Sequence, residues 1–174
     1  MKKTHSAYLS LGSNLGDKTA NLCDAQKAIE DTVGSIHQVS PIYKTPALGF
    51  EGNDFFNLCL EIKTSYTPQE LLENILKIET DLGRQKKTSD SYQNRCIDID
   101  ILLFENILSS TEKLTIPHPR AHLRNFVLYP LNDIASNVHF PNFKLSVKAL
   151  LAKCKDNSAI FKIKTSKLQN NKLL

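Results

Sequence analysis

The spacing of apolar residues divides the chain into short strands and amphipathic helices. Apolar runs rich in branched residues predict strands, whereas apolar residues three and four apart predict helices. We expect strands over residues 7–11, 39–43, 55–62, 95–104 and 114–116, and helices over residues 17–34, 67–83 and after 124. The first six elements follow the order strand, helix, strand, strand, helix, strand. This order is typical of the ferredoxin-like α+β sandwich, in which helices pack on an antiparallel sheet.

The two long helices carry sequence signals at their ends. Asp17 is placed to cap the first helix, whose apolar stripe ends at Gly34. Thr67 and Glu70 have the spacing of a capping box at the start of the second helix, and Gly83 closes it. These signals support the predicted boundaries of both helices.

Two carboxylates lie two residues apart within the isoleucine-rich strand over residues 95–104. Alternate residues of a strand share one face, so Asp98 and Asp100 project together while the isoleucines take the other face. Two acids in apolar surroundings need a counter-charge, and a bound cation can provide it. Oxygen ligands without neighbouring His or Cys favour a hard ion such as Mg²⁺, whose coordination a substrate phosphate would complete. An edge strand with one solvated face is the alternative interpretation.

Cationic side chains flank the ends of the same elements. A polyphosphate bridged by Mg²⁺ requires such an arrangement, because metal ions neutralise some oxygens while guanidinium groups bind others. The cations are Arg84, Lys86, Lys87, Arg95, Lys113, Arg120 and Arg124. Residues 84–94 have almost no apolar side chains, so we expect either a lid over the site or a plain surface loop.

Length and charge limit the alternatives further. A chain of 174 residues suits one domain, and we expect a single domain over residues 1–174 with a lysine-rich extension over residues 144–174. The net charge of +4 comes from this extension, which holds eight lysines and one acid, whereas residues 1–143 hold 14 basic and 17 acidic side chains. A basic extension can bind nucleic acid, but apolar residues among the lysines favour plain solvation, so we expect no nucleic-acid partner.

Cysteine usage and hydropathy indicate the compartment. Cys23, Cys59, Cys96 and Cys154 are scattered without metal-type spacing, which favours buried reduced thiols and a cytoplasmic protein. The first apolar run breaks at Gly12, too early for a signal peptide, and no run approaches the length of a membrane span. We therefore expect a cytoplasmic protein that does not enter a membrane. We also expect a monomer.

Two local motifs resemble known sites only superficially. His118 and His122 have the spacing of a zinc pair on a helix, but Pro119 disrupts a regular helix and no third ligand is evident. His118 is better suited to donate a hydrogen bond to an anion or to serve a structural role. The glycine turn at residues 12–17 lacks the Lys-Ser/Thr of a P-loop and the third glycine of a dinucleotide motif, so a strand-to-helix turn is favoured.

Five motifs in fixed order together resemble one family closely. They are Gly-Ser-Asn-Leu-Gly-Asp at 12–17, Ser-Pro-Ile-Tyr-Lys-Thr-Pro at 40–46, Asp-Phe-Phe-Asn at 54–57, Arg-Cys-Ile-Asp-Ile-Asp-Ile-Leu at 95–102, and Pro-His-Pro-Arg at 117–120 with Phe-Val-Leu at 126–128. Over residues 7–135 the chain resembles the 6-hydroxymethyl-7,8-dihydropterin pyrophosphokinase family. The resemblance implies a ferredoxin-like fold and transfer of pyrophosphate from ATP to the pterin hydroxymethyl group, with release of AMP, in folate biosynthesis.

The resemblance also implies roles for individual residues. Asp98 and Asp100 would be ligands of two Mg²⁺ ions and would act in catalysis together with Arg84 and Arg95. The pterin site would comprise Thr45, Pro46, Leu48, Phe55, Asn57 and Phe126, with the two phenylalanines stacking on the ring. The site of the co-substrate ATP would comprise Leu72, Arg84, Tyr92, Arg95, Ile101, Lys113, Leu114, Thr115, His118 and Arg124.

The chain departs from the family pattern in one loop, and two rival functions share part of the pattern. Residues 92–95 read Tyr-Gln-Asn-Arg where the family commonly has Trp-Gly-Pro-Arg, and lysines stand at 86 and 87 where arginine is frequent, so loop closure is the property most affected. A Mg-dependent nucleotidyltransferase also combines Gly-Ser with Asp-X-Asp, but the two motifs then lie close in sequence. An RNA-binding ferredoxin-like module would expose aromatic residues on its sheet, a pattern that is not visible here.

Overall fold

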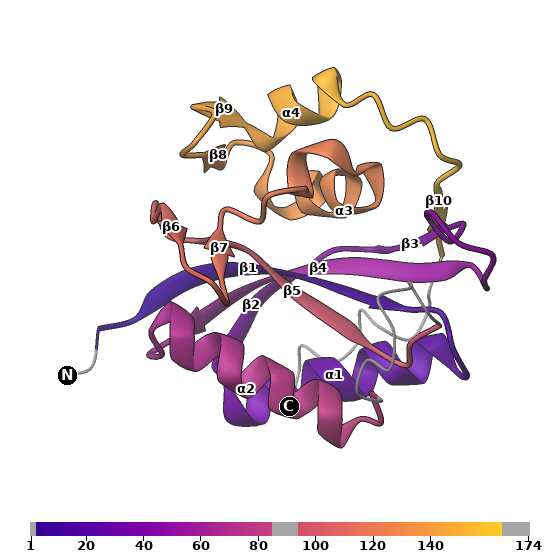
Figure 1. Ribbon diagram of the computed structural model, residues 1–174, viewed down its shortest axis with the longest axis horizontal. Helices are drawn as coiled ribbons and strands as arrows, with labels where there is room; N and C mark the ends of the chain where they lie inside the picture. The colour runs from indigo at the N-terminus through magenta and orange to yellow at the C-terminus, as the bar shows by residue number, and fades with distance from the viewer. Residues whose placement is uncertain (1–2, 85–93, 165–174) are drawn as a thin grey trace.

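Two layers of helices enclose a central antiparallel sheet in the computed structural model, which describes residues 3–84 and 94–164 (Figure 1). The helices are α1 (Lys18–Thr32), α2 (Pro68–Asp81), α3 (Asn125–Ala135) and α4 (Val147–Lys153), with a 3₁₀ turn at Ala121–Leu123. The strands are β1 (His5–Ser13), β2 (Ser35–Val39), β3 (Ile42–Thr45), β4 (Phe55–Thr64), β5 (Asp98–Phe104), β6 (Ser109–Ser110), β7 (Thr115–Ile116), β8 (His139–Phe140), β9 (Leu145–Ser146) and β10 (Phe161–Ile163).

The main sheet has the strand order β10-β3-β4-β1-β5, and β2 also pairs with β4. Every pairing is antiparallel, with Leu9 of β1 opposite Leu60 of β4 on one side and Ile101 of β5 on the other. The predicted ferredoxin-like α+β sandwich is confirmed. The aspartate strand β5 lies at the edge of this sheet, where its Leu102 carbonyl oxygen accepts a hydrogen bond of 2.9 Å from the His118 N–H.

One predicted strand is wrong in its extent. The expected strand over residues 39–43 is two strands, β2 and β3, separated by Ser40 and Pro41. Proline lacks the N–H that a continuous ladder needs. The hydroxyl of Ser40 accepts a hydrogen bond of 2.9 Å from the Cys59 N–H, which keeps that backbone group paired across the break.

Both predicted helix starts are confirmed. Asp17 accepts a hydrogen bond of 3.0 Å from the Ala20 N–H, and Thr67 and Glu70 form a reciprocal capping box. The two closing glycines act differently from each other. Gly83 has φ +93°, a left-handed conformation that favours glycine. A Cβ at Gly34 would instead lie 2.2 Å from the Lys63 carbonyl oxygen, so glycine is required there by close backbone packing.

Successive side chains of each strand point to opposite faces of the sheet, so the apolar core forms two layers. On the face toward α1 and α2 the buried residues include Leu9, Leu11, Leu22, Ile29, Leu58, Leu60, Leu71, Ile75 and Ile99. On the face toward α3 and α4 they include Cys59, Leu103, Val127, Leu128, Leu131, Phe140 and Val147. Each such buried side chain contributes about 1.5–3 kcal/mol through apolar burial. Toward one end of the sheet, the apolar residues of this second face give way to small, polar and acidic residues that line a cavity. These are Ser10, Gly12, Asn57, Asp98 and Asp100.

The C-terminal part contains elements that the lysine pattern does not predict. The sequence predicted residues 144–174 only as a lysine-rich extension of the single domain. Within residues 144–164, α4 packs on α3 and β10 pairs with β3. Residues 165–174 lie outside the described residues. All four cysteines are free thiols, but Cys59 alone is fully buried. Across residues 3–84 and 94–164, no helix is both long and apolar enough to cross a membrane.

Candidate active site

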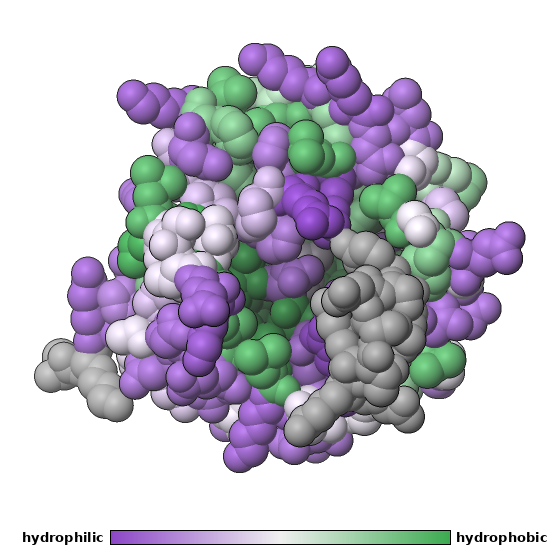
Figure 2. Space-filling model, in the orientation of Figure 1, coloured by the Kyte–Doolittle hydropathy of each residue, from purple (hydrophilic) through white to green (hydrophobic). Residues whose placement is uncertain are grey.

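A cavity of about 290 Å³ lies between the α3 face of the sheet, the loop over residues 46–54 and the start of α3. The face drawn in Figure 2 is hollowed near its centre, with hydrophobic atoms inside the hollow and hydrophilic atoms above it and to its left. The cavity is lined by Ser10, Gly12, Thr45, Pro46, Leu48, Gly49, Phe50, Phe55, Asn57, Arg95, Asp98, Asp100, Arg120, Arg124 and Phe126. All six residues expected at the pterin site therefore lie together, although β3, the loop that follows it, β4 and α3 contribute them from distant parts of the sequence.

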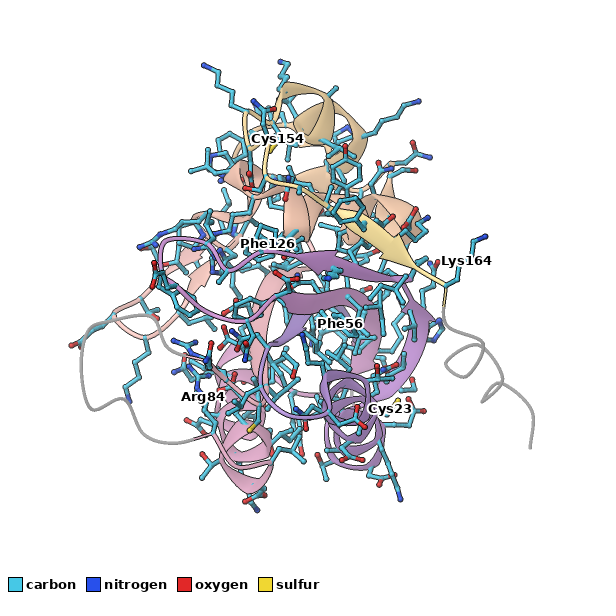
Figure 3. The ribbon with its side chains drawn as sticks, turned by 90° about the vertical axis from the view of Figure 1, so that its right-hand side faces the viewer. Cys23, Phe56, Arg84, Phe126, Cys154 and Lys164 are labelled. Atoms are coloured by element: carbon cyan, nitrogen blue, oxygen red, sulfur yellow. The ribbon has the colours of Figure 1, made fainter. Side chains whose placement is uncertain are left out.

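Aromatic and amide groups give this cavity its shape. Phe126 lies between α3 and the sheet in Figure 3, and the guanidinium carbon of Arg124 lies 5.5 Å from its ring centroid. The amide nitrogen of Asn57 donates a hydrogen bond of 2.9 Å to Thr45 Oγ1, which fixes the orientation of this buried side chain. A Cβ at Gly12 would lie 3.0 Å from Asn57 Oδ1, so a larger residue there would crowd the amide.

A second cavity of about 270 Å³ adjoins the hairpin of β6 and β7. It is lined by Leu72, Ile99, Asp100, Ile101, Thr111, Glu112, Lys113, Leu114, Thr115, His118 and Pro119. Six of the residues expected around the nucleotide are among them. Asp100 lines both cavities, so a ligand in either cavity reaches the same carboxylate.

Two arginines neutralise one of the paired carboxylates. Asp98 Oδ1 lies 2.9 Å from Arg95 Nη1 and 3.1 Å from Arg84 Nη1. Burial and, to a lesser extent, the nearby Asp98 together raise the pKa of Asp100 to about 6, although the surrounding arginines oppose the shift. Asp100 is thus the less compensated acid of the pair.

The donor set of this pair limits the metal that it fits. No group of three or more His, Cys, Asp or Glu side chains within residues 3–84 and 94–164 is arranged to hold a metal ion. Two carboxylates on one strand face suit Mg²⁺, which commonly takes one or two protein carboxylates and completes its shell with water and substrate phosphates. The pattern does not suit zinc, which needs more protein ligands.

A buried glutamate that was not predicted as a site residue connects α2 to the aspartate strand. Glu79 Oε1 accepts a hydrogen bond of 2.7 Å from the Ile99 N–H, and Glu79 Oε2 pairs with Arg84 Nη1. Burial raises the pKa of Glu79 to about 7, although the Ile99 N–H and Arg84 oppose the shift. The available sequence signal was its position four residues after Ile75, on the buried face of the helix.

Asn14 was likewise predicted only as part of a turn. Its Oδ1 accepts a hydrogen bond of 2.7 Å from the Arg95 N–H. Its Nδ2 donates to the Asn53 carbonyl oxygen at 3.1 Å and to Asn94 Oδ1 at 2.8 Å. The turn at residues 12–17 therefore fixes both the loop over residues 46–54 and the backbone that carries Arg95.

His118 is held as a neutral donor. Its Nδ1 accepts a hydrogen bond of 3.1 Å from the Arg120 N–H, which leaves the proton on Nε2. Burial, together with the nearby Arg124 and Arg120, lowers the pKa of His118 to about 4. His122 packs against Phe143, with 4.4 Å between the ring centroids, so the two histidines do not act as a pair.

Arg84 and Tyr92 complete the set of predicted site residues. Arg84 follows α2 and lines neither cavity, but it pairs with both Glu79 and Asp98 (Figure 3). Tyr92, Lys86 and Lys87 lie outside the described residues. Whether residues 84–94 form a lid or a plain surface loop stays a prediction, because residues 85–93 lie outside the described residues.

Comparison with known proteins agrees with this arrangement. Residues 8–136 match the family model described as 7,8-dihydro-6-hydroxymethylpterin-pyrophosphokinase (HPPK). The 2-amino-4-hydroxy-6-hydroxymethyldihydropteridine pyrophosphokinase of Aquifex aeolicus is 39% identical over 142 residues, covering 81% of this chain and 87% of that protein. The enzyme of the same name from Bacillus subtilis is 42% identical over 134 residues, covering 76% of this chain and 79% of that protein.

Solved structures share the fold at lower identity. The HPPK-DHPS of Plasmodium falciparum with pteroate superposes with a TM-score of 0.71 at 17% identity, covering 88% of this chain and 45% of that chain. The present chain thus spans less than half of that protein. With a match over residues 8–136 and relatives about 40% identical over most of their length, this chain belongs to the 7,8-dihydro-6-hydroxymethylpterin-pyrophosphokinase family.

Proposed function

We propose that this chain transfers pyrophosphate from ATP to the hydroxymethyl oxygen of 6-hydroxymethyl-7,8-dihydropterin and releases AMP, as a step of folate biosynthesis. The observation that carries the proposal is the position of Asp100 in the lining of both cavities. A pterin in the larger cavity and a nucleotide in the second cavity would meet at this carboxylate. The reaction needs such a meeting point, because the hydroxymethyl oxygen must reach the β-phosphorus of ATP in line with the leaving oxygen.

The larger cavity has the chemistry that a flat heterocycle requires. Phe55 and Phe126 supply two ring faces, and stacking adds to the affinity gained by apolar burial. The Asn57 amide, together with the backbone of Thr45 and Leu48, would bind the polar edge of the ring. A few polar groups within an apolar cavity give both orientation and selectivity.

Cationic and neutral donors surround the position of the phosphates. Arg95 and Arg124 line the larger cavity, His118 lines the second, and all three would donate to phosphate oxygens. Asp98 and Asp100 would hold two Mg²⁺ ions. Bound Mg²⁺ would neutralise phosphate charge and favour the ionised hydroxyl.

The chemistry then rests on positioning and electrostatics. The hydroxymethyl oxygen bonds to the β-phosphorus, the bond from that phosphorus to the α,β-bridging oxygen breaks, and AMP leaves with that oxygen. The hydroxyl proton passes to solvent. Arg95 and Arg124 would stabilise the charge on the transferred group. Such electrostatic stabilisation is the dominant contribution to catalysis of phosphoryl transfer.

A coupled assay for AMP release tests the proposal directly. With ATP, Mg²⁺ and the hydroxymethyl pterin together, we expect one AMP for each pterin diphosphate formed, and no AMP when any one component is omitted. Release of inorganic pyrophosphate would instead indicate a nucleotidyltransferase. Salt-sensitive RNA binding without a response to pterin would indicate an RNA-binding module.

We also expect the protein to be a monomer in solution. Analytical ultracentrifugation can check this oligomeric state.

A further inference from the structure

A C-terminal strap, which we define as residues 154–163, runs from the end of α4 to the edge of the sheet. In Figure 3 it descends from Cys154, near α4, to the strand β10 that ends beside Lys164. The family match ends at residue 136, so no role for this segment follows from the comparison. Two contacts of the strap with the rest of the protein adjoin walls of the larger cavity, one at the start of α3 and one at β3.

The first contact is a group of hydrogen bonds at the start of α3. The Asp156 carboxylate accepts from the Asn125 N–H at 3.0 Å, from the Ser158 N–H at 3.0 Å and from the Ser158 hydroxyl at 2.6 Å. The Asn125 amide nitrogen donates to the carbonyl oxygens of Asp156 at 3.2 Å and Ser158 at 2.8 Å. Asp156 thereby caps α3 from a position 31 residues away in the sequence.

The residues that these bonds hold are adjacent to the cavity. Asn125 is 3% exposed, and its two neighbours in the sequence, Arg124 and Phe126, line the cavity. Burial raises the pKa of Asp156, but the hydrogen bonds from Ser158 and Asn125, with Arg124 nearby, outweigh it and bring the pKa below its ordinary value. The carboxylate is therefore ionised at neutral pH, which favours its position at a helix N-terminus.

The second contact is with β3 on the opposite side of the cavity. Ile163 of β10 pairs with Ile42 of β3, and β3 ends at Thr45, which lines the cavity. Beside this pairing, Lys162 Nζ lies 3.3 Å from Asp133 Oδ2 of α3, and the Tyr43 hydroxyl donates to the same oxygen at 2.5 Å. The strap thus joins α3 to β3, the two elements that carry opposite walls.

We infer that Asp156 is a positioning residue for pterin binding. Its carboxylate holds the first turn of α3, so that Phe126 faces the cavity at the correct separation from the wall formed by β3. This inference rests on the proposed function, because the ligand that Phe126 would contact is the pterin. The nucleotide cavity is lined by the β6 and β7 hairpin, β5 and α2, which the strap does not contact through any of the bonds above. Arg124, which would bind phosphate, adjoins Asn125, but the lining of the nucleotide cavity itself does not. The strap should therefore influence pterin binding more strongly than nucleotide binding.

Asp156→Ala tests the inference, with Asn157→Ala as the matched control on an exposed neighbouring side chain. Calorimetry at a temperature where circular dichroism shows each variant folded should give a pterin Kd raised about five- to tenfold for Asp156→Ala. The Kd of an ATP analogue should rise by a clearly smaller factor, because Arg124 is the one proposed phosphate-binding residue that adjoins Asn125. If Asp156→Ala does not fold, Ser158→Ala removes one bond to the carboxylate and should raise the pterin Kd alone by about twofold.

A double-mutant cycle with Phe126→Ala separates positioning from general loss of structure. In the Phe126→Ala background, Asp156→Ala should raise the pterin Kd by less than about twofold, because the ring it positions is already absent. The inference would be overturned if Asp156→Ala raised the pterin Kd as much in the Phe126→Ala protein as in wild type. Equal losses of pterin and nucleotide affinity would also overturn it. A wild-type chain that bound no pterin would overturn the proposed function itself, whereas wild-type binding with unchanged variants would overturn only the positioning role.

Discussion

At the residue scale, the paired aspartates are the groups whose charge the site uses most directly. Asp98→Asn keeps the shape of the side chain but removes its negative charge. The proposed metal site loses one anionic ligand, and Arg84 and Arg95 lose the carboxylate with which both pair. We expect Mg²⁺-dependent AMP release to fall by about two orders of magnitude or more, with the fold retained. Steady-state assays and circular dichroism check both parts. Near-normal turnover would contradict the assignment of Asp98 as a metal ligand.

The pKa of Asp100 predicts a pH-dependent stability difference. Its pKa in the folded protein is about 6, raised chiefly by burial from the ordinary 3.8, so folding favours the protonated form. This contribution to stability is fully present below pH 3.8, is lost as the pH rises toward 6, and stays absent above that value. Asn at this position does not titrate. Without Mg²⁺, Asp100→Asn should therefore have a Tm close to wild type near pH 4 and several degrees higher at pH 7 and above.

Thermal unfolding followed at five or six pH values, without divalent ions, measures this difference. Glu79 titrates in a similar range and is present in both proteins, so its effect cancels in the comparison. A Tm difference that does not vary with pH would contradict the prediction. His118, with a pKa of about 4, remains neutral over most of the range and does not confuse the result.

At the element scale, Glu79 is the polar connection between α2 and β5. Glu79→Ala leaves the buried Ile99 N–H without its acceptor and leaves Arg84 with Asp98 alone. An unpaired buried backbone donor destabilises by about 1–3 kcal/mol, which corresponds to a Tm lower by several degrees in a protein of this size. Glu79→Gln keeps an acceptor for Ile99 and should recover much of the loss. Equal destabilisation by both variants would contradict this account.

The elements also show which features the sequence predicts and which it does not. Capping residues and apolar spacing predicted α1 and α2 closely, because both signals are local. The break at Pro41 was missed because the apolar run continues across it, and β10 was missed because three residues among lysines form a strand only by pairing with β3. Asn14 and Glu79 were missed as site residues because their partners lie 81 and 20 residues away in the sequence.

At the scale of the whole molecule, the two cavities meet at one carboxylate, so their ligands cannot bind independently. An empty nucleotide cavity leaves the Asp100 charge uncompensated beside the pterin, whereas Mg²⁺ with an ATP analogue would compensate it. We therefore expect the pterin Kd to fall by about tenfold when Mg²⁺ and a non-hydrolysable ATP analogue are present. Linkage requires that pterin increase the affinity for the analogue by the same factor.

Calorimetry in both orders of addition measures this coupling and checks its reciprocity. Asp100→Asn provides the control, because it removes the charge that both cavities share. In this variant, the factor by which one ligand increases the affinity for the other should fall toward one, even where each ligand still binds. Asn157→Ala, at an exposed residue that lines neither cavity, should leave the factor unchanged. If pterin and the analogue bound wild type with affinities independent of each other, Asp100 would not be the point through which the two sites communicate.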